Sequence, residues 1–141
     1  MKPKLPLRIA SGLLLLHLIF HSIGNSTWKQ TDDPIKRNVI SQMTDHKFPF
    51  MGTTRAMADY FNGFGYIISI ALAFLSLLLW ILSNSSKESL RLTFKILVLI
   101  TVALFVWAID EFVFFFPFAG CITLLAALFS CIATLQLRQH Q

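Results

Sequence analysis

Charged side chains are scarce in this sequence. Lys, Arg, Asp and Glu make up 13% of the 141 residues, whereas hydrophobic residues make up 55%. A soluble chain of this length has one modest core and covers it with polar side chains. Long apolar runs could not be hidden in such a core, so the composition excludes a soluble fold.

Cysteine is also scarce. The only two, Cys121 and Cys131, lie in the same apolar run. On one helix this spacing corresponds to roughly 15 Å of rise, far beyond the reach of a disulfide. We therefore interpret both as thiols that behave as small apolar side chains, and exclude a disulfide framework.

Motifs that carry well-known chemistry are missing as well. The sequence has no Ser-His-Asp order, no glycine-rich phosphate loop and no cofactor fingerprint. The net charge of +5 is not gathered into a basic cluster with interleaved aromatic residues. The sequence therefore predicts no nucleic-acid partner and indicates no particular cofactor.

Four apolar stretches are present instead, at residues 7–24, 56–82, 92–116 and 118–137. A hydrocarbon core of about 30 Å is crossed by about 20 helical residues. The runs are continuous, whereas the strands of a membrane barrel alternate lipid-facing and lumen-facing residues. We predict an all-α, four-helix transmembrane bundle that forms one domain over residues 1–141, with the lipid bilayer as its surroundings.

The first stretch also resembles the apolar core of a signal peptide, since Lys2, Lys4 and Arg8 precede or open it. No A-x-A-like cleavage site follows it. This favours a membrane span over a cleaved leader.

The connection from 25 to 55 is the only long one. Asp33 and Pro34 form a helix cap and first-turn proline, and Ile35, Val39 and Met43 follow at helical spacing. We expect a short amphipathic helix in this first outer loop. Residues 47–52 are expected to form a loop that leads back to the membrane.

Lys and Arg in the short loops indicate the orientation, because they are enriched on the cytoplasmic side. With both termini inside, seven of them lie inside and five outside, and the outside ones share their side with most of the acidic residues. We therefore predict cytoplasmic N- and C-termini, and we expect the membrane to be a bacterial inner membrane. The inside set is Lys2, Lys4, Arg8, Lys87, Arg91, Lys95 and Arg138, and the outside set is Lys29, Lys36, Arg37, Lys47 and Arg55.

Ionisable and polar residues within the spans form the candidate site. At helical spacing, His17 and His21 share one face of the first span, and a second polar stripe runs along one face of the second span. Asp110 and Glu111 point about 100° apart, so we expect only one of them to enter the bundle. The candidate ligand-binding residues are His17, His21, Arg55, Asp59, Asn62, Tyr66, Asp110 and Glu111.

Helical rise places these groups at comparable depth. His21 lies about 20 Å from Arg8, and the two carboxylates about 23 Å from Lys95. Unpaired polar groups are costly in hydrocarbon, so we expect His21 to contact Asp110 or Glu111. The stripe of Thr123, Ala127, Ser130 and Thr134 on the fourth span is interpreted as helix packing.

These residues predict a protein that binds a small amphipathic or lipid-like ligand, or a membrane partner, in an outward-facing polar pocket. A membrane enzyme with a His/carboxylate acid–base pair is one alternative, and a metal site on His17-x-x-x-His21 is another. In the plainest alternative His17 is a hydrogen-bonded core histidine and the cluster a structural network. The sequence indicates no oligomeric state.

The start of the second span also carries a longer motif. Residues 51–65 read Met-Gly-Thr-Thr-Arg-Ala-Met-Ala-Asp-Tyr-Phe-Asn-Gly-Phe-Gly, and His21-Ser-Ile-Gly24 closes the first span. Together they resemble a family of small uncharacterised bacterial membrane proteins with the pattern M-G-x-x-R-x-x-x-D-[FY]-[FY]-x-G-F-G. The resemblance implies four helices, draws attention to His21, Gly24, Arg55, Asp59, Gly63 and Gly65, and implies no activity. The architecture is also similar to that of the DoxX-type four-helix proteins.

Overall fold

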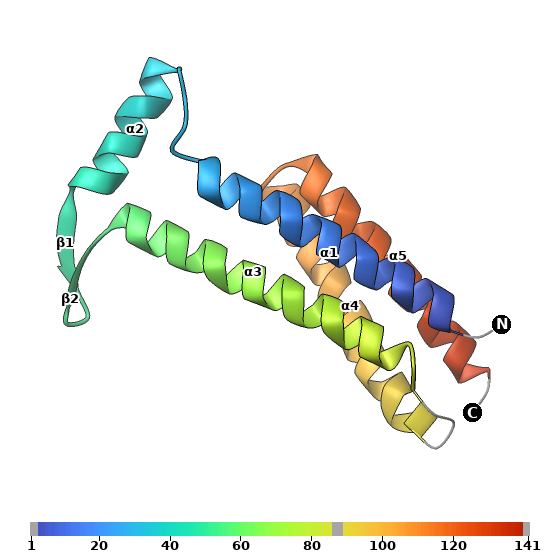
Figure 1. Cartoon of the computed structure of the whole chain (residues 1–141). Helices are drawn as coiled ribbons and strands as arrows, with labels where there is room; N and C mark the ends of the chain where they lie inside the picture. The colour runs from blue at the N-terminus through green and yellow to red at the C-terminus, as the bar shows by residue number, and fades with distance from the viewer. Residues whose placement is uncertain (1–2, 86–88, 140–141) are drawn as a thin grey trace. The chain divides into compact units, whose positions relative to one another are not determined.

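The computed structural model describes residues 3–85 and 89–139. These residues form five helices and one two-stranded antiparallel sheet (Figure 1). Two cations of the orientation argument, Lys2 and Lys87, lie outside the described residues. The elements in chain order are α1 (Lys4–Thr27), α2 (Pro34–Asp45), β1 (Lys47–Phe50), β2 (Thr53–Ala56), α3 (Met57–Leu82), α4 (Leu90–Phe114) and α5 (Pro117–Arg138).

Four of the helices are long and apolar enough to cross a membrane. They contain 24, 26, 25 and 22 residues in α1, α3, α4 and α5, more than the roughly 20 that a bilayer requires. The predicted helical class is confirmed, and a long apolar helix lies over each of the four predicted stretches, with ends displaced by a few residues. Such displacement is usual because helix ends fray and capping residues decide where they stop.

The contacts divide the chain into two compact units. One contains residues 1–18 and 72–141, and the other contains residues 19–71. Helices α1 and α3 each pass from one unit into the other. The two units are described separately below.

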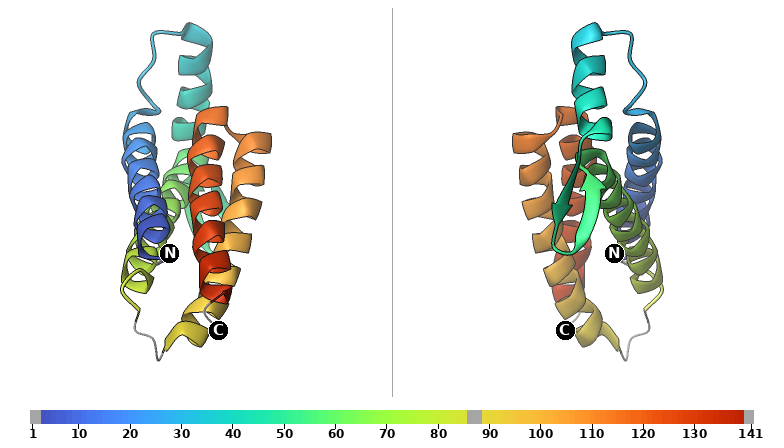
Figure 2. Two further views of the ribbon diagram at one scale, coloured as in Figure 1. Left: turned by 90° about the vertical axis from the view of Figure 1, so that its right-hand side faces the viewer. Right: turned by 90° about the vertical axis from the view of Figure 1, so that its left-hand side faces the viewer.

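In the first unit, α4 and α5 lie side by side along their length (Figure 2). Pro117 is the first residue of α5, and the residue before it, Phe116, has an extended backbone with φ −133° and ψ 147°. Proline imposes this geometry on its predecessor, and the chain turns tightly between the end of α4 at Phe114 and the start of α5. Small side chains let the two backbones approach, and between them Thr101 Oγ1 lies 2.8 Å from Ser130 Oγ.

Serine side chains join α1 to α3 in the same unit. Ser11 Oγ donates to the carbonyl of Ser76 at 2.8 Å, and Ser76 Oγ donates to the carbonyl of Ser11 at 2.9 Å. Nearer the start of α1, the Arg8 guanidinium lies 4.6 Å from the centre of the Trp80 ring. The beginning of α1 and the end of α3 therefore meet at one end of this unit.

The second unit contains α2 and the hairpin. Asp33 caps α2 by accepting hydrogen bonds from the amides of Ile35 and Lys36, and Pro34 is the first helical residue. The expected loop at 47–52 is instead strand β1 with a turn into β2. Met51 and Gly52 both have positive φ, 46° and 82°. Positive φ at both positions is typical of the two-residue hairpin turns whose backbone twist matches the twist of the flanking strands.

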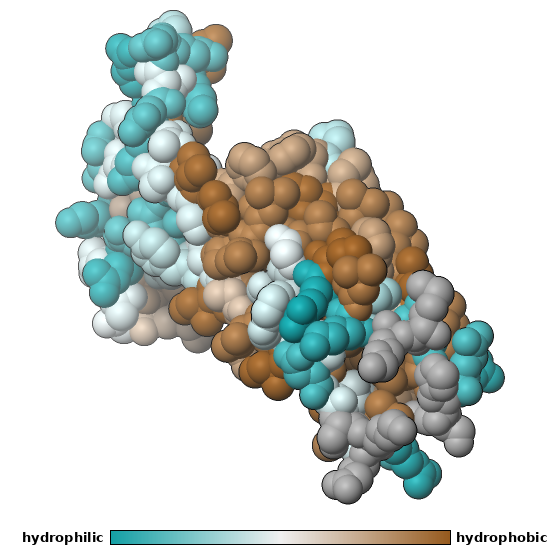
Figure 3. Space-filling view, turned by 45° about the vertical axis from the view of Figure 1, so that its right-hand side comes forward, coloured by the Kyte–Doolittle hydropathy of each residue, from teal (hydrophilic) through white to brown (hydrophobic). Residues whose placement is uncertain are grey.

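Large apolar side chains cover much of the surface (brown in Figure 3). Leu99 on α4 and Ile70 on α3 are 71% and 69% exposed. A soluble monomer rarely exposes contiguous apolar surface on this scale, whereas lipid tails cover it without penalty. The surface therefore suits helices that stand in a bilayer.

Candidate functional site

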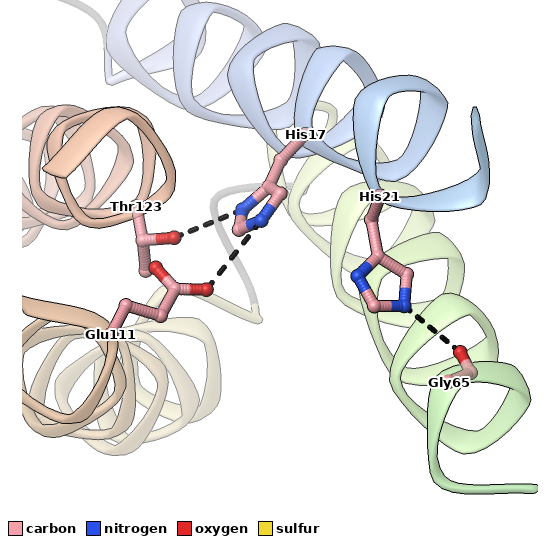
Figure 4. A network of polar contacts seen from close by, with 5 residues as sticks. All are labelled: His17, His21, Gly65, Glu111 and Thr123. Atoms are coloured by element: carbon pink, nitrogen blue, oxygen red, sulfur yellow. Dashed lines mark hydrogen bonds and ion pairs between the residues drawn. The ribbon is translucent and has the colours of Figure 1, made fainter. Parts of the chain in front are cut away.

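The first polar group joins three helices of the first unit. His17 of α1 lies between Glu111 of α4 and Thr123 of α5 (Figure 4). Its Nε2 is 3.5 Å from Glu111 Oε1, and its Nδ1 is 3.0 Å from Thr123 Oγ1. One imidazole thus links a carboxylate and a hydroxyl.

Burial of this group is nearly complete. His17, Glu111 and Thr123 are 4%, 5% and 0% exposed. The side chains of Thr123 and Trp107 also interact with the Glu111 carboxyl group. Nevertheless Glu111 Oε2 is buried without a hydrogen-bond partner among the described residues.

An acceptor oxygen left in this state is costly, because desolvation is not repaid by a hydrogen bond. The neighbouring Asp110 is exposed, so only one of the two adjacent carboxylates enters the bundle, as their angular separation indicates. The arrangement places an imidazole nitrogen beside Glu111 Oε1, and the other oxygen, Oε2, can accept a hydrogen bond from a further donor.

His21 belongs to a different contact. Its Nε2 lies 3.0 Å from the carbonyl oxygen of Gly65, which also accepts from Ser69 Oγ at 3.0 Å. Figure 4 shows this contact between α1 and α3 of the second unit. We expected His21 to contact Asp110 or Glu111, but the imidazole found beside Glu111 is that of His17. Counting helical rise gives approximate depth and does not give the rotation of one helix against another, so it could not distinguish the two histidines.

Polar contacts also fix the part of the second unit that lies next to the hairpin. Trp28 Nε1 donates to Asn62 Oδ1 at 2.8 Å, and the Trp28 ring lies 4.7 Å from that of Phe61. Asp59 Oδ2 accepts from the amide of Ala56 at 3.0 Å, where β2 passes into α3. Asn62 and Asp59 therefore hold local structure in addition to any binding role.

The stripe expected along the second span is not a buried face. Arg55 lies on β2 and not on the helix, because α3 begins only at Met57. Arg55, Asp59 and Tyr66 are exposed, and Asn62 is partly exposed. The stripe was predicted by assuming one continuous helix, in which each residue is rotated by 100° from the one before. This assumption is wrong for Arg55, because strand residues point alternately to opposite faces.

A groove lies beside this region on α3. It has a volume of about 180 Å³ and is lined by Asp59, Tyr60, Gly63, Phe64 and Ile67. Of the candidate residues only Asp59 contributes to it. The aromatic and glycine residues were not predicted as site residues, although Gly63 belongs to the quoted motif.

Among the described residues, no three His, Cys, Asp or Glu side chains lie close enough to hold a metal ion. Thr123 and Trp107 were also missed as members of the buried group. Thr123 is the first residue of the small-residue stripe on the fourth span. That stripe was the one sequence feature that could have pointed to Thr123 as a member of the site. A packing stripe and a ligand-lining stripe have the same composition, so this signal alone does not separate them.

Comparisons with protein-family models, with curated proteins and with solved structures give no match to this chain. The family resemblance carried by residues 51–65 and 21–24 stays a prediction.

Proposed function

We propose that this chain is a multi-pass membrane protein that binds a small amphipathic ligand, with the polar end of the ligand at the His17–Glu111 pair. One observation carries the proposal: Glu111 Oε2 is buried without a hydrogen-bond partner among the described residues. Buried polar atoms are rarely left in this state. A ligand hydroxyl or amine that donates to Oε2 would complete the group.

The surroundings favour a ligand that comes from the membrane. On their outward faces, turned away from the buried pair, α4 and α5 expose apolar side chains such as Ile109 and Phe118, so lipid can surround the helices that carry the pair. A molecule with one hydrogen-bonding end and an apolar body suits such a site, because ligand pockets combine apolar walls with a few polar groups. This proposal retains Glu111 and His17 from the candidate residues and adds Thr123.

The proposed setting is a bacterial inner membrane with both termini in the cytoplasm. The distribution of Lys and Arg in the sequence supports the orientation, and the resemblance of residues 51–65 to small bacterial membrane proteins supports the choice of membrane. In this orientation α2 and the hairpin lie outside the cytoplasm, with α2 as an amphipathic helix at the membrane surface.

The test compares what co-purifies with three forms of the protein in a mild detergent, by native mass spectrometry. Glu111→Gln removes the negative charge and replaces one carboxylate oxygen by an NH2 group, which donates hydrogen bonds and cannot accept them. Asp110→Asn makes the same change on the exposed neighbour and is the matched control. We expect a bound small molecule with the native protein and with Asp110→Asn, and its loss with Glu111→Gln.

Thermal unfolding of each form checks that the Gln variant is folded. If all three forms carry the same small molecules, or if none of them carries any, the binding proposal is overturned.

A second candidate function, a membrane enzyme, is favoured by one feature. Thr123, His17 and Glu111 form a hydroxyl–imidazole–carboxylate chain, the order in which a nucleophile, its base and an orienting group stand. However, Thr123 is fully buried within α5, where backbone amides are engaged in helix hydrogen bonds and cannot stabilise an oxyanion. Covalent labelling of Thr123 by a fluorophosphonate would favour the enzyme, and its absence in the folded protein would favour binding alone.

A further inference from the structure

The groove on α3 has one charged end and otherwise apolar walls. Asp59 lies in the first turn of the helix, and Gly63, Phe64 and Ile67 follow within the next two turns. Glycine at position 63 keeps the floor open, since a Cβ built there meets nothing within 4 Å. The groove can therefore take a narrow apolar chain with a polar group at the Asp59 end.

Its surroundings identify where that chain comes from. Phe64 and Ile67 are 66% and 62% exposed on a helix apolar enough to cross a membrane. Trp28 and Tyr60 lie near the start of α3, and tryptophan and tyrosine are enriched at the headgroup level of membranes. The groove thus runs from the headgroup level into the hydrocarbon, and a lipid of the bilayer is its natural occupant.

The polar end combines a carboxylate with aromatic rings. Tyr60 stacks on Phe48, with ring centres 6.1 Å apart, and meets Phe50 edge-on at 6.4 Å. Asp59 and Tyr60 both line the groove, and Asp59 is exposed. A carboxylate beside aromatic faces is a favourable environment for an ammonium group.

A cation accompanies this cluster. Arg55 is paired with Phe48 in the register of the hairpin, so both side chains are on the same face of the two strands. Arg55 is exposed, and guanidinium groups bind phosphate through paired N–H donors. The hairpin face that carries Phe48 and Arg55 thus offers a guanidinium group for phosphate, and the adjoining groove offers Asp59 and Tyr60 for an ammonium group.

We infer that this region binds a zwitterionic phospholipid. Arg55 binds the phosphate, Asp59 with the rings of Tyr60 and Phe48 binds the ammonium group, and one acyl chain lies along Gly63, Phe64 and Ile67. An anionic phospholipid would satisfy Arg55 but would be repelled by Asp59. The site shares no residue with the His17–Glu111 pair and does not depend on the function proposed for that pair.

The test measures lipid binding to the full-length protein in detergent by native mass spectrometry. The probes are phosphatidylethanolamine, phosphatidylcholine and phosphatidylglycerol with identical acyl chains. We expect both zwitterionic lipids to bind more tightly than phosphatidylglycerol. Asp59→Asn retains an oxygen that can accept from the Ala56 amide. We expect this variant to bind the two zwitterionic lipids about two- to fivefold more weakly, the range for one exposed charge pair. Its affinity for phosphatidylglycerol should not fall.

Gly63→Leu tests the groove itself by filling its floor. Gly12→Leu is the matched control, because glycine 12, like glycine 63, is a helical residue with nothing within 4 Å of a built Cβ. We expect Gly63→Leu to reduce zwitterionic lipid binding and Gly12→Leu to leave it unchanged. Equal binding of all three lipids, tighter binding of phosphatidylglycerol, or equal behaviour of the two glycine variants would overturn the inference.

Discussion

At the scale of single residues, the main feature is a histidine and a glutamate placed together in an apolar bundle. Polar groups in hydrocarbon are costly and therefore pair with one another. The sequence allowed this reasoning for a histidine and one of two carboxylates, and Glu111 is indeed buried while Asp110 is exposed. It did not select His17 over His21, because the choice depends on how α1 is rotated against α4.

We predict that His17→Leu destabilises the protein. The substitution leaves Glu111 Oε1 and the Thr123 hydroxyl without the imidazole, and orphaned buried polar groups cost about 1 to 3 kcal/mol each. Unfolding in a titration from mild detergent into SDS would measure the loss. Asp110→Asn should change the free energy of unfolding by less than about 0.5 kcal/mol, as for an exposed position, and equal effects of the two variants would contradict the role of the buried pair.

Asp45, at the end of α2, gives a prediction on pH. Hydrogen bonds from the Ser41 hydroxyl at 2.6 Å and from the Thr44 hydroxyl at 3.1 Å lower the pKa of the Asp45 carboxyl below its ordinary value of 3.8. A lowered pKa means that the ionised form stabilises α2 above pH 3.8 and that this contribution is lost as pH falls through the lower folded-state pKa.

NMR titration of the Asp45 carboxyl carbon would measure this pKa. Ser41→Ala removes the larger of the two hydrogen-bond effects, so the pKa should move up towards 3.8. An unchanged titration in that variant would show that the hydroxyl does not hold the carboxylate.

At the scale of elements, α1 and α3 depend on small residues for their close approach within each unit. Ser11 and Ser76 bond each other's carbonyls in the first unit. In the second, Gly65 lies against the side chain of Asn25, which a Cβ at position 65 would strike. Sequence patterning located the glycine, but the structure was needed to find the residue that requires it.

We predict that Gly65→Ala is destabilising relative to Gly63→Ala. Both changes gain helix propensity, worth up to about 1 kcal/mol, but only position 65 forces Asn25 to move. The free energies of unfolding should therefore differ by about 1 to 2 kcal/mol, in the range of a modest overpacking. Asn25→Ala combined with Gly65→Ala should recover most of the difference in a double-mutant cycle, and an additive cycle would contradict the contact.

The hairpin is the element that sequence reasoning missed. Pro49 within a short run of aromatic residues argues against a strand, and Met51-Gly52 is not the Asn-Gly pair typical of the turn it forms. By contrast, the turn at Pro117 was predictable because proline constrains the backbone locally. Local constraints are visible in a sequence, whereas a short strand depends on its partner.

At the scale of the whole molecule, hydropathy alone was sufficient to locate the four long helices. Their length and apolar character follow from the thickness of a bilayer, so no tertiary information was needed. The division into two compact units could not be predicted in this way. It depends on which contacts form along α1 and α3, and these contacts have no periodic signature.

We predict a topology with both termini cytoplasmic and the α2–hairpin segment outside, from the excess of Lys and Arg on one side of the spans. The measurement is cysteine labelling in intact cells with a membrane-impermeant maleimide, after replacement of Cys121 and Cys131. A cysteine at Thr31 should be labelled and one at Ser85 should not. Labelling at Ser85 with none at Thr31 would reverse the orientation.

The bond between Trp28 and Asn62 has a consequence for how this chain can be altered. It ties the end of α1 to the first turns of α3, so the two ends of the segment between these helices are held close together. Lengthening a closed loop is inexpensive, at about 0.6 kcal/mol for each doubling. The segment from 29 to 56 therefore has the character of an exchangeable module: it can be enlarged or replaced, by insertion or by design, while the pair of helices that carries it keeps its register.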